Sequence, residues 1–348
     1  MKKIKNKIKF LTILSMLIVS FGIAVTSAYA QSETPVTFSV SAIIPENQID
    51  KNLSYFDLKM EPEMTQTIQI VITNNSNEEI TSNIQINAAS TGTNGVIAYS
   101  EHGIQDKSME YSIEDIAEVA TPEVVIPANK STTVDIKLTM PKESFDGVIL
   151  GGVYVTAESN IENEEVNENG FEIENKIAYA LGLKLTENEK QVEPNMNLKS
   201  IEPSLEAMRT AMNIKLQNSE PIIMKNVMID AQIYKKGENE VLHSAKTTTA
   251  EIAPNSSFDF VVDWENTKIE PGQYRLKMRI EYEDHYWEWD EEFEIKDDKA
   301  SSVNDDAINI EDEFPIWIII IIGAGILSLL LYLAFIFGKR SKKDEEEK

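Results

Sequence analysis

Apolar and polar residues alternate one by one along most of the chain, and this alternation restricts the fold more than any other feature of the sequence. Successive side chains of a β-strand point to opposite faces, so each alternating run predicts a strand with one buried face. Turn-forming residues separate the runs, and short strands at this spacing are typical of β-sandwiches. We therefore predict an all-β protein, in which only residues 113–119 have the pattern of a short helix. The clearest alternating runs are residues 67–73, 83–87 and 133–138.

The same succession of segments occurs twice, which predicts two domains. A strand, an asparagine-containing turn and a second strand span residues 68–86 and again residues 212–233. In each half, a loop with proline and asparagine then leads into a further strand. We expect two tandem immunoglobulin-like β-sandwich domains, at residues 31–187 and 188–299. Strand pairing assigns residues 171–185 to the first domain, as its closing strand region.

An uncharged apolar stretch follows a lysine-rich start at the N-terminal end. The order of basic residues, apolar core and the small-residue site Ala28-Tyr29-Ala30 is that of a secretory signal peptide. We predict a signal peptide at residues 1–30 that is cleaved after Ala30. The alternative is an uncleaved anchor helix, because the apolar stretch is long for a signal core.

A second uncharged stretch lies near the C-terminal end. Roughly 20 apolar residues cross a bilayer as a helix, so residues 315–337 are a predicted transmembrane helix. Trp317 and Tyr332 are suited to the two membrane interfaces. The basic residues that follow predict a cytoplasmic tail at 338–348, which makes this a single-pass type I protein of the cell membrane with its N-terminal part outside. The polar residues 300–314 are predicted to be an acidic stalk.

The chain is strongly acidic and contains no cysteine. Its formal net charge is −26, so a nucleic-acid partner is not expected, because phosphate binding needs a basic face. A basic protein partner would be attracted by this charge, although the charge also serves solubility alone. Without cysteines the exterior part must form a buried core unaided by disulfides, a style of exported protein that suggests a Gram-positive bacterium.

The sequence offers no recognisable catalytic or metal-binding constellation. The three histidines, His102, His243 and His285, lie far apart, and the common hydrolase, metalloprotease and phosphate-loop motifs are absent. We therefore expect no enzyme activity, no catalytic residues, no metal and no cofactor. The acidic residues 162–170 could offer oxygen ligands to calcium, but they lack the spacing of a calcium loop, so a solvated acidic loop is favoured.

The last predicted hairpin carries the only candidate binding residues, Trp287 and Trp289. A four-residue loop at 283–286 would pair Tyr282 with Trp287 and place Arg279 opposite Asp290. Two tryptophans on one face could form a stacking platform for sugars or a peptide. Core packing is favoured over this platform, because their cross-strand partners are also expected to be buried.

Short segments spread over nearly the whole chain form a recognisable series, namely 38–40, 44–48, 55–58, 93–99, 145–152, 216–218, 253–258, 271–274 and 287–289, with Pro141 and Trp264. In this order and spacing they resemble the WxL-interacting proteins of Gram-positive bacteria. The resemblance implies two immunoglobulin-like domains, the first for peptidoglycan binding and the second for host-surface binding, and an association with WxL-domain surface proteins. Family boundaries drawn near Asn160 would give residues 171–185 to the second domain. No family motif of binding residues is carried over.

These features together predict a non-enzymatic, membrane-anchored cell-surface protein that associates with peptidoglycan and WxL-domain proteins. One alternative is a host adhesin that binds extracellular-matrix proteins. Another is an assembly chaperone or receptor for surface proteins, which an exposed sheet edge that captures a partner strand would favour.

Overall fold

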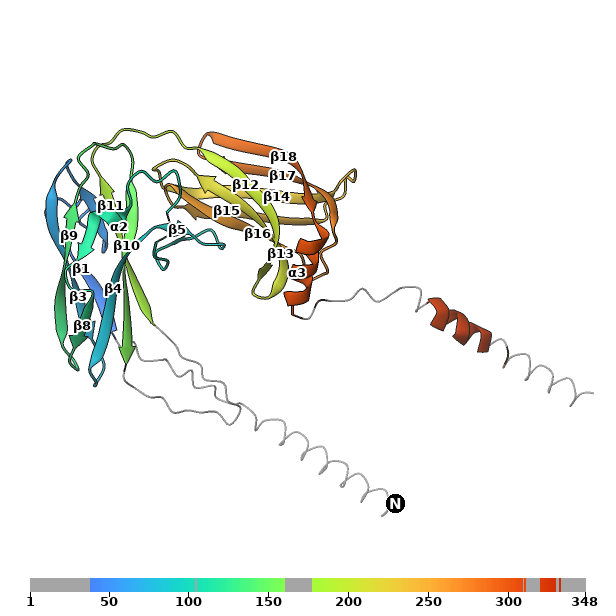
Figure 1. Cartoon of the computed structure of the whole chain (residues 1–348), viewed down its shortest axis with the longest axis horizontal. Coiled ribbons are helices and arrows are strands. Elements are labelled where there is room, and N and C mark those ends of the chain that lie inside the picture. Colours follow the sequence, from blue (N-terminus) through green and yellow to red (C-terminus); the bar gives the residue numbers. More distant parts are fainter. Residues whose placement is uncertain are drawn as a thin grey trace, which may run out of the picture. The chain divides into compact units, whose positions relative to one another are not determined.

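The structure is a computed structural model that describes residues 38–103, 105–159, 177–308, 310, 320–329 and 332 (Figure 1). Within these residues the chain forms two β-sandwiches, each built from two antiparallel-rich sheets, and the predicted all-β immunoglobulin-like architecture is found. The predicted signal peptide at residues 1–30 lies outside the described residues.

The first sandwich packs a four-stranded sheet against a five-stranded sheet. Alternation in β3 buries Ile68, Ile70 and Ile72 in the core between them, as the period of two predicts. The four-stranded sheet has the order β1 (Phe38–Ile43), β3 (Thr65–Asn74), β9 (Ser131–Thr139) and β7 (Ala117–Val119). The five-stranded sheet has the order β2 (Phe56–Lys59), β11 (Ala178–Thr186), β10 (Ile149–Ser159), β4 (Ile80–Ala88) and β8 (Glu123–Ile126).

Strand β11 belongs to the first sandwich. It pairs antiparallel with β10 and parallel with β2, so it lies inside the five-stranded sheet rather than at its edge. Leu183 and Leu185 of this strand are fully buried in the first core. The acidic loop at 162–170, including the suggested calcium ligands, lies outside the described residues.

The predicted helix at residues 113–119 is shorter than expected. Ser112 caps α2 (Ile113–Ile116) by accepting a hydrogen bond from the backbone N–H of Glu114. The chain then changes to the extended conformation, and residues 117–119 pair with β9 as strand β7. The small strands β5 (Ser90–Thr91) and β6 (Ile97–Ala98) form a separate ribbon in the loop before this helix.

The second sandwich packs a three-stranded sheet against a four-stranded sheet around its own core. That core includes Trp264, Met212 and Ile280, each almost completely buried. The three-stranded sheet has the order β12 (Met196–Glu206), β13 (Arg209–Asn218) and β16 (Ser256–Asp263). The four-stranded sheet has the order β15 (His243–Ile252), β14 (Met224–Lys235), β17 (Gly272–Tyr282) and β18 (His285–Ile295).

Both copies of the internal repeat contain a buried asparagine that makes equivalent hydrogen bonds. In the first sandwich, the Asn74 side-chain amide donates to the carbonyls of Ile126 (2.9 Å) and Glu78 (2.7 Å). In the second, the Asn218 amide donates to the carbonyls of Ala253 (2.9 Å) and Ile222 (2.8 Å). Each asparagine therefore ties its own turn to the proline-containing loop of the same sandwich.

The register of the last hairpin differs from the predicted one by two residues. Glu283 and Asp284 alone form the turn, so Tyr282 lies opposite His285 and Arg279 lies opposite Glu288 instead of Asp290. The shorter turn is possible because Glu283 adopts a positive φ of 52°. A shift of two keeps every side chain on its predicted face, so the alternation alone could not select between the two registers.

The first residues of the predicted acidic stalk at 300–314 are helical. Residues 297–306 form helix α3 (Asp297–Asp306), and Ala300 is buried against the second core. The Asn304 side chain exchanges two 2.8 Å hydrogen bonds with the backbone of Ile269. Residues 300–306 therefore belong to a polar helix docked on the sandwich, and the rest of the acidic stalk stays a prediction from the sequence.

The predicted transmembrane helix is only partly within the described residues. Residues 320–329 are helical, but in the part of the chain that the structure describes no helix combines the length and hydropathy required to cross a bilayer. The span at 315–337 therefore stays a prediction from the sequence.

Candidate functional site

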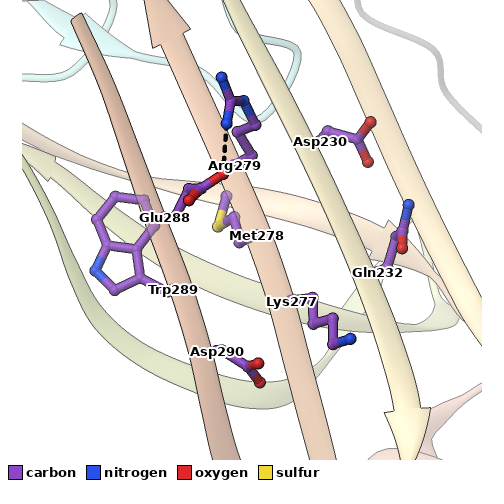
Figure 2. Close-up of a pocket in the computed structure, with 8 residues that line it drawn as sticks. All are labelled: Asp230, Gln232, Lys277, Met278, Arg279, Glu288, Trp289 and Asp290. Atoms are coloured by element: carbon purple, nitrogen blue, oxygen red, sulfur yellow. Dashed lines mark hydrogen bonds and ion pairs between the residues drawn. The ribbon is translucent and has the colours of Figure 1, made fainter. Parts of the chain in front are cut away.

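A shallow hollow on the outer face of the second sandwich is the first candidate site (Figure 2). Side chains of β17 and β18 alternate between the two faces of the sheet, which places Lys277 and Arg279 of β17 beside the acidic residues 288 and 290 of β18. Strand β14 adds polar side chains on the other flank. The lining residues are Asp230, Gln232, Lys277, Met278, Arg279, Glu288, Trp289 and Asp290.

Charge pairing dominates this hollow. Arg279 contacts Glu288 and Glu281 through its guanidinium, and Arg275 reaches Asp290 on the neighbouring strand. The hydrogen bond from Arg275 holds the pKa of Asp290 below its usual range. These groups are solvent-exposed, so the pairs add little to stability. They give the face alternating charge, which suits recognition of a charged protein surface more than any catalytic step.

The structure places Trp287 and Trp289 on the inward face of β18. Trp287 lies opposite Ile280 and Trp289 opposite Met278, and both tryptophans are half-buried against the second core. Their rings therefore contribute to packing at the edge of the sheet. A direct binding role for either tryptophan stays a prediction.

The loop between β4 and α2 joins the first sandwich to the second through Asp106. Its carboxylate accepts hydrogen bonds from the Ser257 hydroxyl (2.5 Å) and the Gln217 amide (2.6 Å) of the second sandwich. Ser108 of its own loop donates to the same carboxylate from its backbone N–H and its hydroxyl. Burial alone would raise the pKa of Asp106, but these hydrogen bonds together outweigh it and hold the pKa below the usual range.

Further hydrogen bonds surround this contact. The Asn255 amide donates to the Ser108 carbonyl (2.9 Å), and the Ala253 backbone N–H donates to the Thr91 hydroxyl (2.9 Å). The Val148 N–H donates to the Pro221 carbonyl (2.8 Å). These residues come from, or lie next to, the short segments that carry the family resemblance. That part of the resemblance therefore includes residues that hold the two sandwiches together.

Replacing Asp106 by Asn is expected to lower the free energy of unfolding at pH 7 by about 1–3 kcal/mol, because the amide cannot accept all the hydrogen bonds that the carboxylate accepts. A carboxyl whose folded pKa is lowered stabilises the fold above its unfolded pKa, near 4, and that stability is lost as the pH falls through the folded pKa. Denaturant titrations between pH 2 and 7 should therefore show a smaller acid-dependent loss in the variant. Equal pH profiles would contradict this role.

The three histidines lie in separate places in the structure and form no common site. His102 contacts Asn87 and Glu114, His243 stacks on Trp264 at 4.1 Å, and His285 lies near Glu193 at the hairpin tip. Burial lowers the pKa of His243. Across residues 38–308, with the gaps named above, and the short helical segment 320–329, no group of three or more acidic or histidine side chains is arranged to hold a metal ion.

Sequence reasoning missed a second candidate surface, on the outer face of the five-stranded sheet. There Tyr154 of β10 lies beside Ala180 of β11 and Gln85 of β4. Tyr55 and Tyr99, from two loops, lie over the adjacent glycines. The alternation of small and polar residues within these strands was the available sequence signal for this surface. It does not predict which strands are neighbours in the sheet.

The fold defines a protein of two tandem β-sandwich domains. Residues 38–157 match the family model described as the peptidoglycan binding domain of WxL Interacting Protein, and residues 168–305 match the model described as its host binding domain. The chain therefore belongs to the WxL-interacting protein family, which confirms the resemblance found in the sequence.

The boundary between the two family models does not follow the fold. The second model begins at residue 168 and so includes β11, whereas β11 pairs with β10 and β2 of the first sandwich.

Solved structures of similar fold include fimbrial chaperones at low identity. A chaperone–tip adhesin complex of CFA/I fimbriae is 15% identical, with 74% of this chain and 97% of that chain covered and a TM-score of 0.29. The Salmonella enterica SafA pilin–SafB chaperone complex is 13% identical, with 68% of this chain and 99% of that chain covered and a TM-score of 0.28. The Pseudomonas aeruginosa CupB2 chaperone is 12% identical, with 68% of this chain and 96% of that chain covered and a TM-score of 0.26. Among curated proteins no sequence match was found.

Proposed function

We propose that this protein is a non-enzymatic, membrane-anchored surface protein that binds peptidoglycan and WxL-domain surface proteins. The observation that carries the proposal is the match of both halves of the chain to the two binding domains of one family. The signal-peptide pattern at residues 1–30, the apolar stretch at 315–337 and the basic tail support an outward-facing, single-pass arrangement in a Gram-positive cell membrane.

In this proposal each sandwich binds a different kind of partner. The first sandwich contacts the cell wall through a face of its five-stranded sheet. The second sandwich offers the charged face of β17 and β18 to protein partners, where alternating charges would select orientation and partner. The acidic charge of the chain would favour partners with a basic surface.

Co-sedimentation with purified peptidoglycan sacculi tests the wall-binding part. We expect the full chain in detergent to pellet with sacculi above the level of an equally acidic control protein. A supernatant that holds all of the protein at every sacculus concentration would remove peptidoglycan from its partners and leave the protein-binding role.

A second candidate function is binding to host extracellular-matrix proteins. It is favoured by one observation, the charged hollow of Figure 2 on the residues that match the host binding domain. Binding of the full chain to immobilised matrix protein should then weaken when Arg275 and Arg279 are both replaced by Glu, and Lys225→Glu, an exposed change outside the hollow, serves as the control. Equal binding by all three proteins would contradict this role for the hollow.

A further inference from the structure

The outer face of β11, β10 and β4 is neutral over most of its area. Neighbouring outward positions follow from the strand register: Tyr154 lies between Ala180 and Gln85, and Thr156 lies between Ala178 and Asn83. Ala178, Ala180 and Gln85 are exposed, and Tyr154 is half-buried. The two alanines therefore leave a low shelf alongside the Tyr154 ring.

Among the described residues of these strands, the charged side chains lie at the margins of this shelf. The Lys184–Asp57 pair lies at one end of the sheet, with 3.1 Å between its charged atoms, and Glu158 and Glu123 lie toward the other end and the β8 edge. The corresponding outer face of the second sandwich is instead covered by charge pairs. In a chain with a formal net charge of −26, an uncharged face of tyrosine, amide and hydroxyl groups is distinctive.

Two glycines extend the aromatic part of the face. Gly152 of β10 and Gly182 of β11 lie opposite each other, two residues along from Tyr154 and Ala180. A Cβ at Gly152 would lie 2.7 Å from the Tyr99 ring, and one at Gly182 would lie 3.5 Å from the Tyr55 ring. The absence of a Cβ at Gly152 thus leaves room for the Tyr99 ring against the sheet, and the Tyr55 ring lies near Gly182.

The tyrosines keep their hydroxyls neutral. Burial raises the pKa of Tyr99 to about 12, with smaller contributions from Tyr55 and Glu251, and burial also raises the pKa of Tyr55. Both therefore remain hydrogen-bond donors as well as acceptors across the physiological pH range. An aromatic surface with neutral donors and acceptors matches the apolar faces, hydroxyls and acetamides of amino sugars.

We propose that this tyrosine–amide face, formed by Tyr55, Tyr99, Tyr154, Gln85, Asn83 and the Ala178–Ala180 shelf, binds the N-acetylhexosamine glycan strand of peptidoglycan. The inference rests on the proposed wall binding and names its ligand class and location. Charge complementarity selects the glycan over the stem peptides. The glycan presents neutral groups to a neutral face, whereas stem peptides carry ionised amino and carboxylate groups for which the shelf offers no partner.

Strand β11 is essential to this site, although it lies outside the residues matched by the peptidoglycan binding domain model. Ala178, Ala180 and Gly182 all belong to it. The ligand surface would therefore be completed by a strand that the family boundaries give to the other domain.

Binding of full-chain variants to sacculi, with a soluble N-acetylglucosamine tetramer as competitor, tests the inference. Tyr154→Ala is expected to weaken binding at least about tenfold, since a central aromatic contact of this kind is commonly a hot spot. Ala180→Glu should weaken it similarly by placing bulk and charge on the exposed shelf. The tetramer should displace the wild-type chain from sacculi, and a free stem tetrapeptide at the same concentration should not.

Tyr286→Ala provides the matched control, because Tyr286 is an equally large tyrosine, 61% exposed, on the second sandwich. It should bind sacculi like the wild type. If both Tyr154→Ala and Ala180→Glu bind sacculi within twofold of the wild-type affinity, the glycan face is overturned while wall binding stays intact. Displacement of the wild type by the stem tetrapeptide instead of the sugar would have the same meaning. A wild-type chain that does not pellet would instead reject the proposed function itself.

Discussion

A fragment of residues 31–157 is expected to be unfolded or aggregated, whereas a fragment of residues 31–187 folds into a stable sandwich. The longer fragment contains β11, which pairs with eight residues of β10 and four of β2. The shorter one loses fully buried Leu183 and Leu185, each worth about 2–5 kcal/mol, together with the hydrogen bonds of an inner strand. That loss rivals the whole stability of a typical domain, about 5–15 kcal/mol.

Circular dichroism and thermal unfolding of the two fragments measure this difference. The longer fragment should show a β-sheet spectrum and a cooperative transition, and the shorter should show neither. A cooperative transition in the fragment that ends at residue 157 would mean that β11 is dispensable for the first sandwich. It would also remove the structural reason for placing the boundary after β11 and not before it.

Replacing Asn74 or Asn218 by Ala is expected to lower the free energy of unfolding by about 1–3 kcal/mol, because either change leaves one buried and at least one part-buried backbone carbonyl without its donor. Both asparagines are fully buried. Urea titration of residues 31–308 gives the effect of each change. A loss of the same size in both sandwiches would show that the two turns are energetically equivalent copies.

The neighbouring residue supplies the control for this prediction. Asn75 is exposed, and its side chain makes only a long 3.5 Å hydrogen bond to Ser39, so Asn75→Ala should change the free energy of unfolding by less than about 0.5 kcal/mol. A similar loss from Asn75→Ala and Asn74→Ala would mean that the turn is sensitive to any substitution, and that the buried hydrogen bonds are not the cause.

The alternating pattern predicted faces but not registers. In the last hairpin it correctly placed Tyr274, Leu276 and Ile280 inward, yet the pairing was wrong by two residues. Side-chain orientation repeats every two residues, so any even shift satisfies the same burial. The turn conformation at Glu283 removes this ambiguity, and a glutamate with positive φ gives no sequence signal.

Helix α3 could not be predicted from the sequence, because it lacks the pattern of a packed helix. Its sequence is polar and acidic, and only Ala300 of this helix is buried. Such a segment has no amphipathic pattern that would distinguish it from a solvated linker. Its docking depends on Asn304 meeting the backbone of Ile269, a contact between residues 35 positions apart.

The sequence by itself determined the fold class, the two-fold repeat and the family, because alternation, turn residues and the order of short segments are local properties of the chain. Only the tertiary structure decided that β11 lies between β10 and β2, that Asp106 joins the first sandwich to the second, and that Tyr55, Tyr99 and Tyr154 share one face. Those features join residues far apart in the chain. Their proximity follows from strand order in the sheets and from burial of a common core, which no local pattern records.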